Sequence, residues 1–295
     1  MKTGFYFLLL LYAVQVSAAK SAEPMQDTIP FVLTEHNNLI VQTILNGSDT
    51  LDLMFHTAIS GVSLTTAALE KAGSLKIDQS TEVQSWGGKS EAGYSENNAL
   101  QIGSFHWDSL SIWTSGKSGH YSDGKFGPDL FAGKIIEINF THRILVLHTN
   151  RVFQDTTYQQ FPLHFEQSSM YIDGICGDGS ATFPNTFMIH SGYGGTLLLD
   201  DDYSSTSGFN KSLNVTSESE LKDSYGNVLK TKKAVLPSFE VGGAVFSDLP
   251  IAFFEGKIGN QKSSVLGGGL LKQFDVILDI EREHVYLRRS KLPAE

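Results

Sequence analysis

Cysteine is nearly absent from this chain of 295 residues, which contains only Cys176. A single cysteine cannot form a disulfide within the chain. Its neighbours Ile175 and Gly177 suggest a strand or turn, so we interpret the thiol as a small, half-buried side chain. A chain of this length can bury a core for one or two domains without such a cross-link.

Positive charge is also scarce. Lysine and arginine number 22 against 32 aspartates and glutamates, which gives a formal net charge of −10, and the basic residues form no stripe. Binding to nucleic acid or to an anionic membrane surface requires the opposite sign, so we expect no nucleic-acid partner. The G-x-S-x-G motif of serine hydrolases, the P-loop and the dinucleotide fingerprint are missing as well.

Long apolar runs are missing apart from one near the N-terminus. Lys2 precedes an apolar stretch at residues 5–16, and small residues follow at Ser17, Ala18 and Ala19. This arrangement predicts a signal peptide over residues 1–19, with an uncleaved anchor as the alternative, and hence an exported protein, periplasmic or extracellular. No later segment could span a membrane as a helix, so we expect no stable membrane span after signal cleavage.

Helical periodicity is limited to three short candidates, at residues 65–72, 129–134 and 269–273. The rest of the chain consists of short β-rich runs separated by Gly, Asn, Asp and Ser. Examples of these runs are residues 39–45, 51–55, 135–147 and 276–287. This pattern predicts an all-β fold.

An internal repeat divides the chain into two halves. Three elements recur in the same order: an apolar run that ends in a polar turn, an apolar-Gly element, and a Gly-containing turn before a second apolar run. The first half has Leu53-Met54-Phe55-His56-Thr57-Ala58, Leu100-Gln101-Ile102-Gly103 and Phe126-Gly127-Pro128-Asp129, and the second has Phe187-Met188-Ile189-His190-Ser191-Gly192, Phe239-Glu240-Val241-Gly242 and Leu266-Gly267-Gly268-Gly269. We therefore predict two homologous lobes, at residues 30–150 and 158–292.

These elements resemble the pepsin/retropepsin-like aspartic peptidases, especially the exported bacterial two-lobed type. The resemblance covers about residues 30–290 and is most specific where Val265-Leu266-Gly267 is followed by Phe274-Asp275-Val276-Ile277-Leu278-Asp279. It implies a bilobal pepsin-like fold, in which two β-barrel-like lobes enclose a cleft. It also implies that each lobe contributes one turn to the floor of that cleft.

The chain differs from this family at the positions of the two catalytic residues. His56-Thr57-Ala58 and His190-Ser191-Gly192 stand where the family has Asp-Thr-Gly and Asp-Ser-Gly. The family mechanism needs two facing carboxyls that share a proton, one as base and one as acid. Two imidazoles do not supply four coplanar oxygens around a water, and an imidazolium places positive charge beside it. We therefore expect degenerate dyad positions at His56 and His190, with no catalytic residue.

The residues around the two histidines keep other features of the family. Thr57 and Ser191 carry the hydroxyls that, in the family, hydrogen-bond across the lobe interface and support the two loops. Residues 85–88 predict a hairpin tip where the family has its cleft-covering flap, which makes Trp86 and Tyr94 candidates for lining the cleft. A surface position for these aromatic residues is the alternative. Residues 223–227 predict a second hairpin tip.

The resemblance favours a catalytically inactive homologue, a pseudopeptidase that binds a peptide or other extended ligand in the cleft and needs no cofactor. Two alternatives remain open. One is an active hydrolase with an atypical His dyad, or with Asp129 and Asp279 as its acids. The other is a metal-binding protein in which His56 and His190 hold an ion such as Zn²⁺, although two ligands are too few for a tight site and the sequence offers no third.

Overall fold

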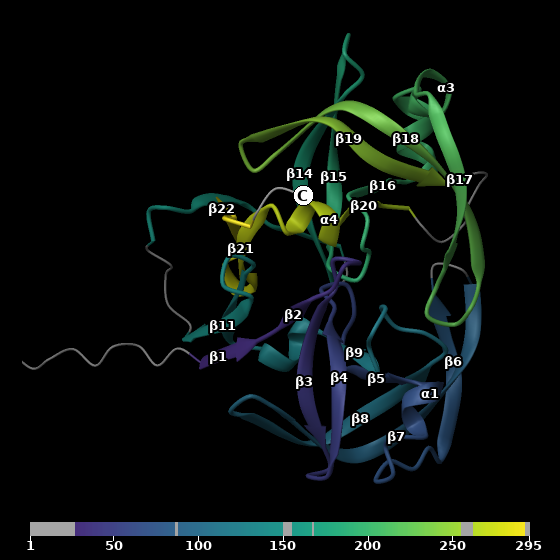
Figure 1. Cartoon of the computed structure of the whole chain (residues 1–295), viewed down its shortest axis with the longest axis vertical. Coiled ribbons are helices and arrows are strands. Elements are labelled where there is room, and N and C mark those ends of the chain that lie inside the picture. Colours follow the sequence, from purple (N-terminus) through teal and green to yellow (C-terminus); the bar gives the residue numbers. More distant parts are fainter. Residues whose placement is uncertain (1–26, 86–87, 150–154, 167, 255–261, 293–295) are drawn as a thin grey trace, which may run out of the picture.

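The protein is built almost entirely from β-strands in three sheets, as the computed structural model shows (Figure 1). The structure describes residues 27–85, 88–149, 155–166, 168–254 and 262–292. The predicted signal peptide at residues 1–19 and the predicted flap residue Trp86 lie outside the described residues. No helix in the described ranges is long and apolar enough to cross a membrane.

The first lobe is an eight-stranded sheet that is curled by a further pairing between its second and seventh strands. In order across the sheet the strands are β2 (Val32–Leu33), β3 (Leu39–Leu45), β4 (Asp49–Phe55), β9 (Gly124–Phe126), β5 (Val62–Thr65), β8 (Phe105–Ser115), β7 (Gly88–Ile102) and β6 (Gln79–Ser85). The extra pairing joins β3 to β7, which brings the two ends of the sheet together around an apolar interior.

The second lobe repeats this order strand for strand. Its sheet consists of β13 (His164–Glu166), β14 (Ser169–Gly177), β15 (Thr182–His190), β20 (Ser264–Gly267), β16 (Leu197–Leu199), β19 (Ala244–Phe254), β18 (Val228–Val241) and β17 (Val215–Lys222), with β14 also paired to β18. The turns between the long strands match as well, because Gly103 and Gly242 both have a φ of +58°, in the left-handed region that glycine tolerates. The predicted duplication into two all-β lobes is confirmed.

A third sheet joins the lobes. It has six strands in the order β1 (Asp27–Pro30), β11 (Ile144–Thr149), β10 (Lys134–Asn139), β21 (Phe274–Asp279), β22 (His284–Arg289) and β12 (Gln159–Pro162). The antiparallel pair of β10 and β21 is the junction, and Glu137 lies opposite Ile277 at its centre. Each lobe thus contributes three strands to one continuous hydrogen-bonded layer.

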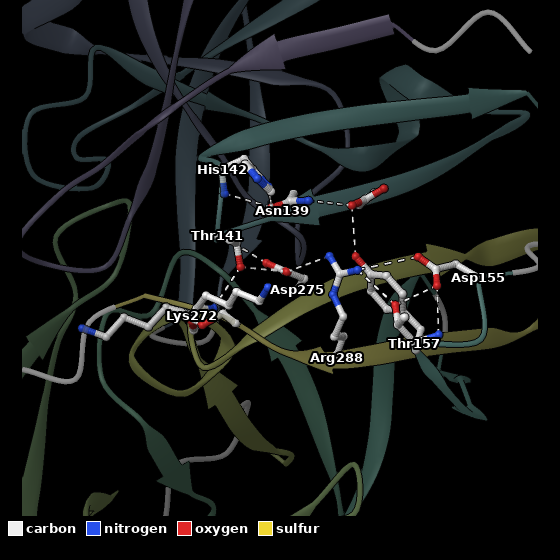
Figure 2. Close-up of polar contacts among 12 residues, drawn as sticks. Asn139, Thr141, His142, Asp155, Thr157, Lys272, Asp275 and Arg288 are labelled. Atoms are coloured by element: carbon white, nitrogen blue, oxygen red, sulfur yellow. Dashed lines mark hydrogen bonds and ion pairs between the residues drawn. The ribbon is translucent and has the colours of Figure 1, made fainter. Parts of the chain in front are cut away.

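Polar contacts beside this shared sheet also connect the lobes (Figure 2). The backbone N–H and the hydroxyl of Thr141 both donate to the carboxylate of Asp275, each at 2.9 Å, and Arg288 donates to the same carboxylate at 3.0 Å. The phenol of Tyr158, from the second lobe, donates to Glu137 of the first lobe at 3.0 Å. The side chain of Asp275 is almost completely buried, so these bonds are shielded from water.

The short helices lie mostly where the sequence predicts them. The expected segments 65–72, 129–134 and 269–273 contain α1 (Thr66–Leu69), the 3₁₀ helix η1 (Pro128–Phe131) and α4 (Gly268–Leu271), which are shorter than expected or displaced by a residue. The sequence analysis missed α2 (Asp201–Thr206) and α3 (Phe209–Ser212), and a second 3₁₀ helix, η2 (Ile280–Arg282), lies between the last two strands. Asp200 caps α2, because its carboxylate accepts the N–H of Tyr203 at 2.9 Å.

Cys176 is more deeply buried than the sequence predicted. Its side chain is fully buried rather than half-buried, on β14 in the interior of the second lobe. Burial disfavours the thiolate and raises the pKa of the thiol to about 12. A thiol with this pKa is unreactive at neutral pH, so Cys176 serves as a core residue.

Candidate functional site: the floor and ceiling of the inter-lobe cleft

A cavity of about 1740 Å³ lies between the two lobes and is lined by described residues of both. His56 and His190 lie at its floor. His56 directly follows β4, and its backbone N–H donates to the carbonyl of Phe126 at 3.0 Å, while His190 is the last residue of β15. The two imidazole rings face each other with centroids 4.6 Å apart and planes inclined by 60°. The structure thus brings the two predicted dyad positions together.

Backbone contacts determine which nitrogen of each imidazole carries the proton. Nδ1 of His56 accepts the N–H of Ala58 at 3.2 Å, and Nδ1 of His190 accepts the N–H of Tyr193 at 3.0 Å. A backbone N–H can only donate, so Nδ1 is unprotonated in both rings and the proton of each neutral imidazole lies on Nε2. The site therefore presents two N–H groups where an acid dyad would present carboxyl oxygens.

The surroundings of the two imidazoles keep them neutral. Burial lowers the pKa of His190 to about 4, with a further contribution from the nearby positive charge of Lys125. Burial also lowers the pKa of His56 well below its usual value, and the neighbouring His190 and Lys125 add to this effect. Low-dielectric surroundings and a like charge both disfavour an imidazolium, so both rings are uncharged at neutral pH.

Gly192 leaves the space that the imidazole of His56, from the opposite lobe, occupies. A Cβ atom at this position would lie 2.3 Å from both Cδ2 and Nε2 of His56. Only a residue without a side chain leaves room for the imidazole there. By contrast, Ala58 occupies the matching position of the first lobe and lines the cavity.

The hydroxyls of Thr57 and Ser191 exchange hydrogen bonds across the lobe interface. The hydroxyl of Thr57 donates to the carbonyl of Ile189 at 2.7 Å and accepts the N–H of Ser191 at 3.0 Å. Reciprocally, the hydroxyl of Ser191 donates to the carbonyl of Phe55 at 2.7 Å and accepts the N–H of Thr57 at 3.0 Å. Both side chains are 1% exposed or less, so four shielded bonds hold the two loops together. The loop-supporting geometry expected for these hydroxyls is present.

Two hairpins form the ceiling of the cleft, one from each lobe. In Figure 1 the green hairpin of β17 and β18 extends down to the blue strand β6. At their tips the hydroxyl of Ser85 donates to the carboxylate of Asp223 at 2.6 Å. Lys117, which follows β8, donates its backbone N–H to the carbonyl of Ser224 in the second tip at 3.0 Å. The two predicted hairpin tips thus contact each other across the cleft, a contact that the sequence analysis did not predict.

Tyr94 is part of the first hairpin, on β7. Its ring stacks on Trp113 with centroids 4.7 Å apart, and its hydroxyl donates to Gln79 at 2.5 Å. Among the described residues, Trp113 lines the cavity and Tyr94 does not. Tyr94 therefore packs beside a lining residue, directly opposite it on the adjacent strand.

Lys125 is a site residue that the sequence analysis missed. It lies on β9, it is 7% exposed, and its side chain lines the cavity near the two histidines. Burial lowers the pKa of its ammonium to about 8, although Asp223 opposes this shift, so the group is still mainly charged at neutral pH. The repeat contains the signal that could have found it, because Lys125 occupies the position that Val265 holds in the second lobe.

The other residues considered from the sequence lie apart from the floor. Asp129 accepts the N–H of Gly61 at 2.8 and 3.0 Å, and Asp279 forms an ion pair with Arg282 at 3.0 Å. Neither carboxylate lines the cavity. In the described part of the chain, no group of three His, Cys, Asp or Glu side chains is arranged to hold a metal ion.

Comparisons with known proteins agree with this architecture. No family model and no curated protein matches the chain. Among solved structures, the aspartic proteinase from Irpex lacteus superposes with a TM-score of 0.59, and the match covers 90% of this chain and 98% of that one at 14% sequence identity. Because the sequence identity is this low, the match shows a shared fold and nothing further. This chain has the fold of the pepsin-like aspartic proteinases.

Proposed function

We propose that the protein is a catalytically inactive homologue of the aspartic peptidases, which acts outside the cytoplasm and binds a peptide or other extended ligand between its lobes. One observation carries the proposal. Both positions that would hold the catalytic carboxyls are occupied by neutral imidazoles, while the cross-lobe bonds that support the floor are complete. The cleft is retained and its acid pair is replaced.

The protonation of the imidazoles argues against hydrolysis at this floor. A water molecule is activated by a group that accepts its proton, and the two Nε2–H groups can only donate. Moving the proton to Nδ1 would direct it at the N–H of Ala58 or of Tyr193 and would replace an attractive contact by a repulsive one. The same cost applies to coordination of a metal ion by Nε2, and this argues against the metal-binding alternative.

The lining of the cleft supports an extended ligand. The cavity lies between the lobes, and its lining includes residues of β6 and β17, the edge strands of the two lobe sheets, where a peptide backbone can find hydrogen-bond partners. It also includes the apolar side chains of Met54, Met188 and Leu198, which suit apolar groups of a ligand.

Two measurements test the proposal together. The purified mature protein is incubated with reduced, carboxymethylated casein across acidic to neutral pH, and no cleavage is expected. Rhodamine-labelled pools of randomised hexapeptides are then titrated by fluorescence polarisation. We expect binding by the wild type, loss of binding in Ala58→Trp, which fills the floor, and retention in Ala132→Trp, which adds the same side chain at an exposed position outside the cleft.

Two results would contradict the proposal. Cleavage of casein that disappears in a His56→Gln/His190→Gln variant would show an active hydrolase. Failure of every pool to bind, or equal binding by the wild type and Ala58→Trp, would show that the cleft is not the ligand site.

A further inference from the structure

The ammonium of Lys125 is buried with unusually little compensation. To the described residues it donates one hydrogen bond, to the hydroxyl of Ser224, although an ammonium has three donors. No ion pair within the described residues involves Lys125. A buried charge is normally paired with an opposite charge because its removal from water is costly. The arrangement therefore leaves room for an anion that the chain itself does not supply.

Asp223, the acidic group whose charge acts on Lys125, already accepts hydrogen bonds from other groups. Its two carboxylate oxygens accept hydrogen bonds from Ser85, from the backbone and side chain of Asn227, and from the N–H of Tyr225, all at 2.6–2.9 Å. These bonds shape the tip of the second hairpin. The carboxylate attracts Lys125 from a distance without forming an ion pair with it.

A second unsatisfied polar group lies beside Lys125. Ser63 is 8% exposed, and its hydroxyl is buried with no hydrogen-bond partner among the residues that the structure describes. Ser63 lies directly opposite Lys125 in the antiparallel pair of β5 and β9, so the two side chains are on the same face of the sheet, and both line the cavity. A donor-rich ammonium and an unpaired hydroxyl thus point into the same part of the cleft.

The matching positions of the second lobe are apolar. There Val265 and Leu198 form the equivalent pair, and both line the cavity within an apolar cluster. The duplicated fold thus has a polar, positively charged half of the floor and an apolar half. The two imidazoles between them are neutral and add no negative charge.

We propose that the cleft floor binds an acidic peptide, with a ligand carboxylate at Lys125 and Ser63 and an adjacent apolar side chain against Val265 and Leu198. The ammonium and the hydroxyl donate to the carboxylate, and the charge-assisted bond gains strength from the buried surroundings. This assignment rests on the proposed peptide binding and adds its selectivity.

Other charged side chains line the cleft, three acidic and three basic, and all but the buried Asp223 are exposed. The additional titratable lining residues are Glu35, His36, Lys117, His120, Tyr193, Glu220, Lys222, Asp223, Tyr225 and Lys233. Lys230 is exposed, lies outside the cavity lining and has the same charge as Lys125, so it offers a matched control for long-range attraction between the protein and an acidic ligand.

The test compares two rhodamine-labelled hexapeptide pools by fluorescence polarisation. One pool has glutamate at a fixed position between two apolar residues, and the other has glutamine there. We expect the wild type to bind the glutamate pool at least roughly tenfold more tightly, the size of a single charge-assisted contact. Lys125→Met should bind both pools equally, and Lys230→Met and Lys125→Arg should keep the preference.

The outcomes separate this inference from the function on which it rests. Equal binding of both pools by the wild type, or a preference that survives in Lys125→Met, overturns the acidic selectivity and leaves peptide binding intact. No binding of any pool overturns both. Circular dichroism verifies that Lys125→Met is folded, which we expect because Val265 occupies the same position in the second lobe. If that variant does not fold, the test of acidic selectivity rests on whether the wild type prefers the glutamate pool to the glutamine pool.

Discussion

Removal of one cross-lobe hydroxyl should destabilise the protein more than removal of an equally buried hydroxyl within one lobe. Thr57→Val keeps the shape of the side chain but deletes two hydrogen bonds, one donated to Ile189 and one accepted from Ser191. Each loss leaves a buried backbone group without that partner, which costs about 1–2 kcal/mol, so the free energy of unfolding should fall by about 2–4 kcal/mol.

Thr43→Val is the matched control. Thr43 is also 1% exposed, but its hydroxyl makes one bond, to Leu51 of the adjacent strand at 3.1 Å, so a loss of about 1 kcal/mol is expected. Urea unfolding followed by fluorescence and circular dichroism measures both variants, with the m-value compared to the wild type. Equal destabilisation by Thr57→Val and Thr43→Val would refute the view that the paired hydroxyls hold the lobes together.

Three further changes test the floor and the ceiling. Gly192→Ala should displace the imidazole of His56 and lower stability by about 1–3 kcal/mol, measured by urea unfolding and by the Cε1–H resonance of that ring. The free energy of unfolding should fall between pH 6.5 and 4, by up to about 3 kcal/mol from His190, because that imidazole takes up a proton near 6.5 when unfolded but near 4 when folded. Ser85→Ala should accelerate amide hydrogen exchange in the hairpin tip at Asp223, because the contact between the hairpins is lost.

Each of these three predictions has its own control. Gly73→Ala meets no atom within 4 Å and should leave stability nearly unchanged, so equal effects at the two glycines would contradict the steric argument. His190→Gln should lose less stability than the wild type over the same pH range, and parallel curves would show that this histidine is not the titrating group. Ser104→Ala removes an exposed bond to Asp27 elsewhere and should not alter exchange at the hairpin tip.

Most of the architecture could be predicted from the sequence because it depends on local patterns that occur twice. The apolar runs before His56 and His190 become β4 and β15, and the two predicted hairpin tips, which contain Gly88 and Gly226, lie between paired strands. The missed helices α2 and α3 are too short to show helical periodicity. The capping residue Asp200 marks where α2 begins, whereas α3 begins after Gly208 without a side-chain cap.

The features that escaped prediction depend on contacts between distant segments. From the sequence alone, Lys125 would be assigned to the surface. It is buried because β9 lies between β4 and β5. The contact between Ser85 and Asp223 joins residues 138 positions apart. The proton positions on the two imidazoles follow from backbone N–H groups whose direction is known only once the turns are folded.

The six-stranded sheet shared by the lobes has a kinetic consequence. A hinge motion that widened the cleft would break the pairing of β10 with β21 and the buried bonds between Thr141 and Asp275. The ceiling, in contrast, is held by a few contacts at the tips of two hairpins. Local opening of the hairpins therefore limits how fast a ligand enters and leaves, so its residence time should respond to substitutions at the tips while the lobes stay fixed.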